Sequence, residues 1–303
     1  MEHLVNEVGF PGLGLKFTLN RIAMIFESAT KQLHFYPPFL RNGSWSGGAF
    51  PEGVRVYWYG IIIAIAVLTG ALCAILEGKR NGIKSDRMAD LICLEVLFGI
   101  IGARLYFVLF NLAEFTSFWD VFRINEGGLA IYGAVIGGMF AVWLYSRLTK
   151  ADIRLLADIC VGGLIIAQAI GRWGNFLNVE AYGVPVKILW PWRMTVPATD
   201  YLTGLPSTVV VHPTFLYESL WNLIGFSLIL WYRKRKKFNG EVFLIYVAWY
   251  GLGRAFIEGL RMDSLPYRAT WRVSQIVAIV SCAATVALIV YARRKFRLVP
   301  KKK

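Results

Sequence analysis

The chain has 303 residues, of which 56% are hydrophobic and only 17% are charged, and its mean hydropathy is +0.51. This apolar share lies well above that of soluble domains and indicates an integral membrane protein. The formal net charge of +14 would suit an anionic partner, but the basic residues are placed as membrane topology requires, so we expect no nucleic-acid partner.

Runs of mostly apolar residues recur along the chain, each close to the roughly 20 residues that a helix needs to cross a bilayer. The expected fold class is therefore an all-α integral membrane protein with seven transmembrane helices. The spans are predicted at Trp58–Leu76, Met88–Leu112, Leu129–Leu148, Leu155–Phe176, Thr214–Tyr232, Glu241–Glu258 and Val273–Tyr291.

Lys and Arg gather in alternate connections, which predicts the orientation because cytoplasmic loops carry an excess of these residues. Basic clusters follow the first, third, fifth and seventh spans, and the densest is Arg233–Lys237. The connection between the second and third spans is nearly neutral. The pattern predicts an N-terminus outside the cytoplasm and a C-terminus inside it.

Residues 1–55 are predicted to form an extracytoplasmic N-terminal arm. Within Phe17–Leu33, four apolar residues would share one helical face, which is typical of a helix lying in the membrane interface: Leu19, Ile22, Ala23 and Phe26. A loosely ordered tail fits the same segment equally well.

The longest outer connection, residues 177–213, contains Pro185, Pro191, Pro197 and Pro206 among aromatic residues. It is predicted to form a small extracytoplasmic head or lid between the fourth and fifth spans. We find no internal repeat and no linker, so residues 1–303 are expected to form a single membrane domain.

Polar side chains cluster where the fourth span ends. Ionisable residues inside a span are costly and generally face a bundle interior or a watery cavity. In AIGRWGNFLNVEAYG, Arg172, Asn175 and Asn178 recur at every third position, and Glu180 follows. A continuing helix would present the first three along one side.

A second cluster lies in WYGLGRAFIEGLRMD, at the end of the sixth span. Four of its residues would share one helical face: Tyr250, Arg254, Glu258 and Arg261. Other spans add Tyr59, Arg104 and Tyr132, and under the predicted topology most of these residues lie near outer ends. Several segments are therefore expected to place polar groups at the same depth in the membrane.

Some of these residues also have a simpler interpretation. Arg104 and Arg261 fit equally well as side chains that reach the interface, and Tyr59 as part of an aromatic belt. Glycines spaced like Gly133-x-x-x-Gly137 favour helix packing over catalysis. Arg172 and Arg254 favour a functional site, because each lies within a polar cluster.

Two arginines beside amides and a glutamate suit an anionic ligand. A guanidinium stays charged and matches phosphate oxygens with a planar fork of donors. The natural anion at the outer leaflet is a phospholipid head group. The two clusters therefore predict a site for a lipid phosphate.

GRWGNFLNVEAYG resembles the signature of the prolipoprotein diacylglyceryl transferases, which runs G-R-x-G-N-F-x-N-x-E. Further matches follow in chain order: YWYG at 57–60, GARLYFVLFN at 102–111, EGGLAIYG at 126–133, HPTFLYE at 212–218 and YGLGRAFIEGLR at 250–261. The joint match is far more specific than any single piece. The seven-span, N-out arrangement of that family also agrees with the predicted topology.

The resemblance implies an enzyme of the bacterial plasma (inner) membrane whose active site faces the extracytoplasmic side. It would move the diacylglyceryl group of phosphatidylglycerol to the lipobox cysteine of a preprolipoprotein signal peptide, forming a thioether and releasing glycerol phosphate. Besides these substrates, its partners are membrane lipids. The resemblance implies no metal and no organic cofactor, and the nucleophilic thiol belongs to the substrate.

Residue by residue, Arg172 and Arg254 match the essential arginines of the family. They would hold the phosphodiester and offset charge on the departing phosphate. The residues predicted to bind substrate are Tyr59, Arg104, Asn175, Asn178, Glu180, Tyr250, Glu258 and Arg261.

Tyr132 departs from some family members, which have at this position a histidine that is proposed as the base for the thiol. A phenol with a pKa of about 10 is a poor base for a thiol with a pKa of about 8.5. We therefore expect Tyr132, the third predicted catalytic residue, to orient lipid or thiol by hydrogen bonding. The arginines would favour the thiolate.

A lipid or anion transporter with an arginine-lined cavity is the alternative from another functional class. It would need polar residues that continue to the cytoplasmic ends of the spans, and broken helices near the midplane. The inner halves, such as VLTGALCAIL and AVWLYS, are largely apolar. This favours a pocket that opens on one side.

Overall fold

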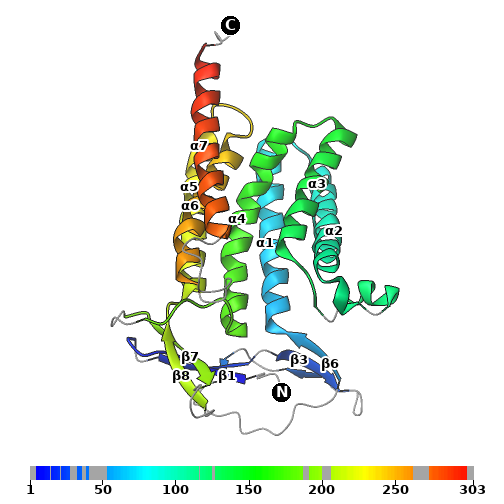
Figure 1. The fold of residues 1–303 in the computed structure, drawn as a ribbon. Coiled ribbons are helices and arrows are strands. Elements are labelled where there is room, and N and C mark those ends of the chain that lie inside the picture. Colours follow the sequence, from blue (N-terminus) through cyan, green and yellow to red (C-terminus); the bar gives the residue numbers. More distant parts are fainter. Residues whose placement is uncertain are drawn as a thin grey trace. The chain divides into compact units, whose positions relative to one another are not determined.

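The computed structural model contains seven long helices at the predicted positions among the residues it describes (Figure 1). They are α1 (Trp58–Arg80), α2 (Ser85–Phe110), α3 (Ile131–Thr149), α4 (Ile153–Asn178), α5 (Thr214–Tyr232), α6 (Glu241–Ile257) and α7 (Val273–Leu298). Short 3₁₀ turns are η1 (Leu112–Glu114), η2 (Phe118–Phe122), η4 (Arg233–Arg235) and η5 (Glu258–Leu260). The described residues are 5–13, 15–20, 22–27, 33–35, 39–40, 53–115, 117–124, 127–186, 191–199, 206–261 and 273–298.

Five of the described helices are long and apolar enough to cross a membrane: α1, α2, α3, α4 and the Ser274–Lys295 part of α7. Helix α6 has only 17 residues, and α5 includes the polar Glu218 and Asn222. The helical state of all seven segments is confirmed, whereas seven membrane crossings stay a prediction.

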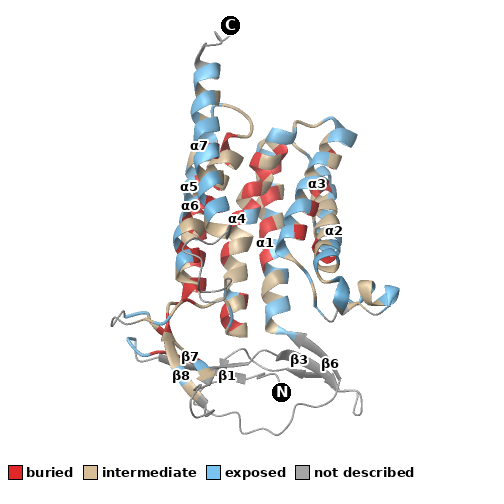
Figure 2. Cartoon of the chain, viewed as in Figure 1, coloured by how far each residue is buried: buried red, intermediate tan, exposed pale blue. Residues whose placement is uncertain are grey.

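The outer faces of these helices expose large apolar side chains, as lipid contact requires. Leu68 of α1 is 69% exposed, Leu109 of α2 67% and Phe256 of α6 68%. Figure 2 shows exposed residues along much of α7 as well. Water would make such surfaces unfavourable, so they support a membrane location.

In the described ranges, eight strands accompany the helices: β1 (Val5–Phe10), β2 (Leu15–Asn20), β3 (Ile22–Glu27), β4 (Leu33–Phe35), β5 (Phe39–Leu40), β6 (Gly53–Tyr57), β7 (Met194–Thr199) and β8 (Pro206–Val211). They form an antiparallel five-stranded sheet of order β5-β2-β1-β7-β8 and a three-stranded sheet of order β4-β3-β6. The β7–β8 hairpin lies within the predicted head between α4 and α5.

The prediction of an interfacial helix in Phe17–Leu33 is wrong, because the described part of this segment belongs to β2, β3 and the start of β4. The physical reason lies in its period. In Leu15–Asn20, apolar residues alternate with Lys16, Thr18 and Asn20, which is the two-residue repeat of a strand. The helical spacing of its apolar residues was coincidental. The all-helical expectation thus holds for the long segments and fails for this arm.

The contacts of the chain group it into two compact units, and the expectation of a single membrane domain stays a prediction. The first unit contains residues 1–69, 164–234 and 244–303, and the second contains residues 70–163 and 235–243. The first therefore holds both sheets, α5, α7, the start of α1, the end of α4 and most of α6. The second holds α2 and α3 with the remaining parts of α1, α4 and α6.

A buried apolar cluster in the first unit joins the five-stranded sheet to the ends of two helices. It combines Val8 and Phe10 of β1, Met194 and Val196 of β7, Val211 of β8, Phe176 and Leu177 of α4, and Phe215 of α5. Phe176 and Phe215 stack with ring centroids 4.6 Å apart. This packing fixes the end of α4 beside the start of α5, where the polar clusters lie.

In the second unit, glycines let α2 and α3 approach closely. A Cβ atom on Gly137 would run into the Phe98 carbonyl, and one on Gly133 into the Gly102 carbonyl. The predicted packing role of the Gly133-x-x-x-Gly137 spacing is confirmed. Small residues at such contacts are a common device of membrane helices.

Gly137→Val should therefore destabilise the protein, because the added side chain forces α3 away from α2. We expect a loss of about 2 kcal/mol or more, visible as a lower midpoint for thermal loss of the monodisperse protein in detergent. Gly138→Val is the matched control, because a Cβ on Gly138 has open space around it. Equal midpoints for the two variants would contradict this account of the packing.

Candidate functional site

The buried Glu218 carboxylate gathers three arginines in the first unit. Oε2 lies 2.5 Å from Nη2 of Arg172, and Oε1 lies 3.5 Å from Nη1 of Arg254 and 3.5 Å from Nη1 of Arg261. Glu218 is only 6% exposed. A carboxylate this deep is stable only when paired, and here its partners come from α4, α6 and the residue after η5.

A second buried carboxylate braces one of these arginines. Glu258 Oε2 lies 2.6 Å from Nη2 of Arg254, and Glu258 Oε1 accepts a 2.8 Å hydrogen bond from the Ser274 hydroxyl at the start of α7. Arg254 is thus held between Glu218 and Glu258. This fixes the guanidinium while leaving its side chain 22% exposed.

Backbone pairing brings Arg261 to the cluster. Gly183 and Arg261 form an isolated antiparallel bridge, Val184 N donates to Leu260 O at 2.7 Å, and Gly183 N donates to His212 O at 2.9 Å. A Cβ on Gly183 would lie 2.6 Å from the His212 Cβ. The last glycine of GRWGNFLNVEAYG therefore permits this close approach.

The end of α4 forms a hydrogen-bonded chain of polar side chains. Arg172 Nη1 donates to Asn175 Oδ1 at 3.1 Å, and Asn175 Nδ2 donates to Glu180 Oε1 at 2.9 Å. Asn178 Nδ2 donates to the same Glu180 oxygen at 3.3 Å. The predicted grouping of these four residues is present, with Arg172 at its inner end and the exposed Glu180 at its outer end.

Two residues beside Glu180 adopt a left-handed backbone conformation. Val179 has a φ of 52° and Ala181 a φ of 56°. This region is unfavourable for residues other than glycine, and especially for a β-branched one. The strained turn reverses the chain after α4, which lets Glu180 reach back to the two asparagines.

Two tyrosines of the predicted set also lie in the first unit. The Tyr59 ring of α1 packs over Gly174 of α4, where an added Cβ would lie 2.8 Å from ring atom Cδ2. Tyr250 of α6 lies four residues before Arg254 and lines a small pocket. The other lining residues are Glu218, Trp221, Asn222, Gly253, Arg254 and Ile257.

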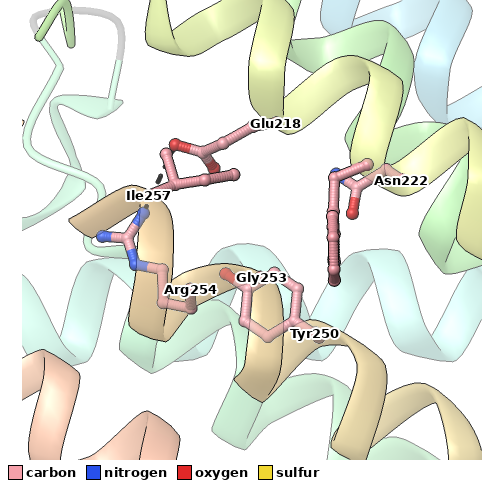
Figure 3. Close-up of a pocket in the computed structure, with 7 residues that line it drawn as sticks. Glu218, Asn222, Tyr250, Gly253, Arg254 and Ile257 are labelled. Carbon is pink, nitrogen blue, oxygen red and sulfur yellow. Dashed lines mark ion pairs between the residues drawn. The ribbon is translucent and has the colours of Figure 1, made fainter. Parts of the chain in front are cut away.

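Figure 3 shows a close-up of this pocket with its lining residues. Glu218 and Arg254 extend toward one another, and Asn222 lies on the other side of the pocket from Arg254 in this view. Trp221 and Trp249 stack with ring centroids 4.2 Å apart, and each indole N–H donates to the backbone carbonyl of the other residue at 3.0 Å. This reciprocal pair fixes α5 against α6.

Arg104 has a different environment, in the second unit. Its guanidinium donates to the carbonyl oxygens of five residues in the α2–α3 connection: Asp120, Val121, Arg123, Gly127 and Gly128. Its side chain also lies over the Phe107 and Phe115 rings. Since all its N–H groups face backbone oxygens, the geometry favours a role in holding this connection over the predicted contact with substrate.

Tyr132 also belongs to the second unit, in the first turn of α3. It is 61% exposed, and its ring lies 6.1 Å from that of Tyr106. That Tyr132 belongs to the same site as the arginines stays a prediction. Glu126 of the EGGLAIYG match lies outside the described residues.

His212 is a helix-start residue in the structure. Its carbonyl accepts from Gly183 and Thr214, and its ring Nδ1 lies 3.2 Å from the Tyr217 hydroxyl. Burial lowers the pKa of His212 below its usual value. A neutral imidazole at pH 7 suits this structural hydrogen bond.

Glu218, Asn222 and the Trp221–Trp249 pair were missed as site residues. The HPTFLYE match contains Glu218, and Asn222 follows four residues later on the same helical face, so the spacing of polar residues in an apolar helix was an available signal. The reciprocal tryptophan pair has no such signal, because it depends on how α5 and α6 meet.

The cluster retains a positive charge for a ligand. Among the described residues of the cluster, three guanidiniums and the two buried carboxylates of Glu218 and Glu258 sum to one formal positive charge. The arginine side chains are 13% to 22% exposed. An anion with several oxygens fits this arrangement, because guanidiniums bind such groups through paired hydrogen bonds.

Comparison of the sequence with known proteins identifies the family of the chain. The family model described as prolipoprotein diacylglyceryl transferase matches residues 49–291. The chain is similar to proteins named phosphatidylglycerol–prolipoprotein diacylglyceryl transferase from Listeria welshimeri, with 41% identity over 80% of this chain and 87% of the relative, and from Clostridioides difficile, with 38% over 80% and 93%. One from Bacillus licheniformis is 40% identical over 82% and 93%.

Glu218→Gln should destabilise the protein, because it removes the charge that three arginines share. We expect a loss of about 3 kcal/mol, measured as thermal unfolding in detergent. The control is Glu180→Gln, whose exposed carboxylate should contribute below about 1 kcal/mol. A smaller effect at Glu218 than at Glu180 would show that Glu218 does not organise the cluster.

Proposed function

Because the chain belongs to the prolipoprotein diacylglyceryl transferase family, we propose that it transfers the diacylglyceryl group of phosphatidylglycerol to the lipobox cysteine of preprolipoproteins. The substrate thiol forms a C–S bond to the terminal glyceryl carbon of the diacylglyceryl group. The bond from that carbon to the phosphate oxygen breaks, glycerol phosphate leaves, and the thiol proton passes to solvent or a base. The product is a thioether.

The observation that carries this proposal is the gathering of Arg172, Arg254 and Arg261 around Glu218. Carbon–oxygen cleavage places growing negative charge on the departing phosphate. Fixed guanidiniums in a site shielded from water stabilise that charge without reorganising. Arg172 and Arg254 would bind the phosphate, and Glu258 would orient Arg254.

The hydrogen-bonded chain at the end of α4 would bind the outer part of the head group. Asn175, Asn178 and Glu180 offer amides and a carboxylate, which pair with glycerol hydroxyls as donors and acceptors. Tyr59 and Tyr250 would complete the lipid site on either side of Arg172 and Arg254. Arg261 would add positive charge beside the phosphate.

The family and the apolar helices make this a bacterial membrane protein. We further propose seven spans in the inner membrane with the site on the extracytoplasmic side. Within the first unit, the strands and the C-terminal end of α7 lie at opposite ends (Figure 1). Arg293 near that end of α7 hydrogen-bonds Tyr232 at the end of α5, just before the basic run, which suits a cytoplasmic surface.

The transporter alternative is not favoured, since the similar proteins are named as transferases. A direct test uses purified protein, phosphatidylglycerol and a lipobox peptide. Transfer predicts release of glycerol phosphate together with a peptide mass increase equal to one diacylglyceryl group. A peptide with Ser in place of Cys should give neither. Lipid movement without peptide modification would refute the proposed function.

Arg172→Ala or Arg254→Ala should lower turnover by roughly 100-fold or more, because each removes a donor to the phosphate. The lysine variants should recover only part of the rate, since lysine lacks the bidentate fork. Arg154→Ala is the control, because that exposed arginine pairs with Asp152 away from both polar clusters in the sequence. Full turnover of Arg254→Ala would remove it from the mechanism.

Tyr132→Phe should lower turnover about tenfold with an unchanged pH profile, if the tyrosine orients a substrate by one hydrogen bond. A general base would behave differently, because its loss would also remove a limb of the pH–rate profile. The measurement is the initial rate of peptide modification between pH 6 and pH 10, taken as approximate limits for thiol titration. Wild-type rates across this range would exclude the tyrosine from the mechanism.

A further inference from the structure

A second layer of polar side chains lies one helical turn from the arginine cluster. Asn222 follows Glu218 by four residues on α5, Tyr250 precedes Arg254 by four on α6, and Gln168 precedes Arg172 by four on α4. Glu218 lies near the start of α5, whereas the two arginines lie near the ends of α4 and α6. The three residues of the second layer therefore lie on the same side of the arginine cluster, about 6 Å away along the helix axes.

Asn222 is the notable member of this layer. It is 3% exposed and lines the pocket beside Glu218 and Arg254 (Figure 3). Within the part of the chain that the structure describes, its side-chain amide makes no hydrogen bond. The amide borders the pocket and pairs with no described side chain, so its donor is available to a ligand in the pocket.

The pocket around Asn222 combines apolar surface with the charged side chains of Glu218 and Arg254. Trp221, Gly253 and Ile257 form apolar surface, and the Tyr250 hydroxyl is a second polar group that makes no hydrogen bond to the described residues. Such a lining suits a largely apolar ligand with one or two hydrogen-bonding atoms.

The position of the layer identifies the part of the lipid. In a phospholipid whose phosphate lies at the arginines, the head-group alcohol extends toward the outer end of the helices and the acyl chains extend toward their middle. The first polar groups on the acyl side of the phosphate are the two ester carbonyls. These oxygens only accept hydrogen bonds, and the Asn222 amide and the Tyr250 hydroxyl can both donate.

We propose that the Asn222 side-chain amide donates a hydrogen bond to an ester carbonyl of the diacylglyceryl group, and so selects ester-linked lipid and sets the position of the glyceryl carbon that the thiol attacks. This inference rests on the proposed transferase function. Asn222 acts on the group that is transferred, whereas the arginines act on the group that leaves. Its loss should therefore alter the choice between lipids that differ only at the ester carbonyls.

The test compares phosphatidylglycerol with its 1,2-di-O-alkyl ether analogue of equal chain length, which keeps the phosphate and the head group but lacks both carbonyls. Wild-type protein should use the ester lipid with a kcat/KM about tenfold higher than that of the ether lipid, as expected for one well-placed hydrogen bond. Asn222→Leu should lose most of this preference, with kcat/KM for the ether lipid nearly unchanged.

Because both lipids are assayed on one preparation, the ratio does not depend on the fraction of protein that is folded. Asn222→Asp is a second variant of the same shape that replaces the amide donor with an acceptor, and it should also lose the preference. Ser219→Ala is the matched control: Ser219 is buried on the same helix and bonds the Ala169 carbonyl and the Trp173 indole, outside the pocket lining. Its ester-to-ether ratio should equal that of wild type.

The outcomes separate the two proposals. Wild-type protein that forms no thioether peptide from phosphatidylglycerol would refute the transferase function itself. An active wild type with Asn222 variants that keep the ester preference, or lose both lipids equally, would overturn the role of Asn222 and leave the function standing. The Asn222 variants could instead differ from wild type only in their rate with phosphatidylpropanol, a lipid that lacks the head-group hydroxyls. That result would assign the amide to the head group and would also overturn the proposal.

Discussion

A single buried carboxylate holds this site together. Glu218 is shared by Arg172 of α4 and by Arg254 and Arg261 from the region around the end of α6, and no one of these charges would be stable at that depth by itself. Together with Glu258, the described charges of the cluster sum to one formal positive charge. The same interaction thus makes the cluster stable in the protein and leaves it attractive to an anion.

Much of the surrounding structure brings these charged groups together. The Phe176–Phe215 stack fixes the end of α4 beside the start of α5, the Trp221–Trp249 pair fixes α5 beside α6, and the Gly183 bridge brings in Arg261. The strained turn around Glu180 extends the polar chain outward. Rigid support of this kind is what electrostatic catalysis needs, because donors that move with the ligand lose their advantage over water.

The sequence predicted the helices well, because long apolar runs have few alternatives, and it grouped the polar residues at the ends of α4 and α6 by spacing. It did not predict the strands β2 and β3, because the apolar residues Leu19, Ile22, Ala23 and Phe26 have the spacing of a helical face, nor that Arg104 binds five backbone carbonyls. Such contacts depend on loop conformation. Glu218 and Asn222 can be recognised in the sequence as polar residues in an apolar helix. Their roles cannot be predicted from it, because these depend on the side chains that neighbouring helices place beside them.

The central claim is that the arginines around Glu218 bind the phosphate of the lipid substrate. An experimental structure of the protein with phosphatidylglycerol and without a peptide tests it most directly, because no thiol is present to consume the lipid. The account predicts the phosphate within hydrogen-bonding distance of Arg172 and Arg254, with the acyl chains extending past Asn222. A phosphate bound away from both guanidiniums would contradict it.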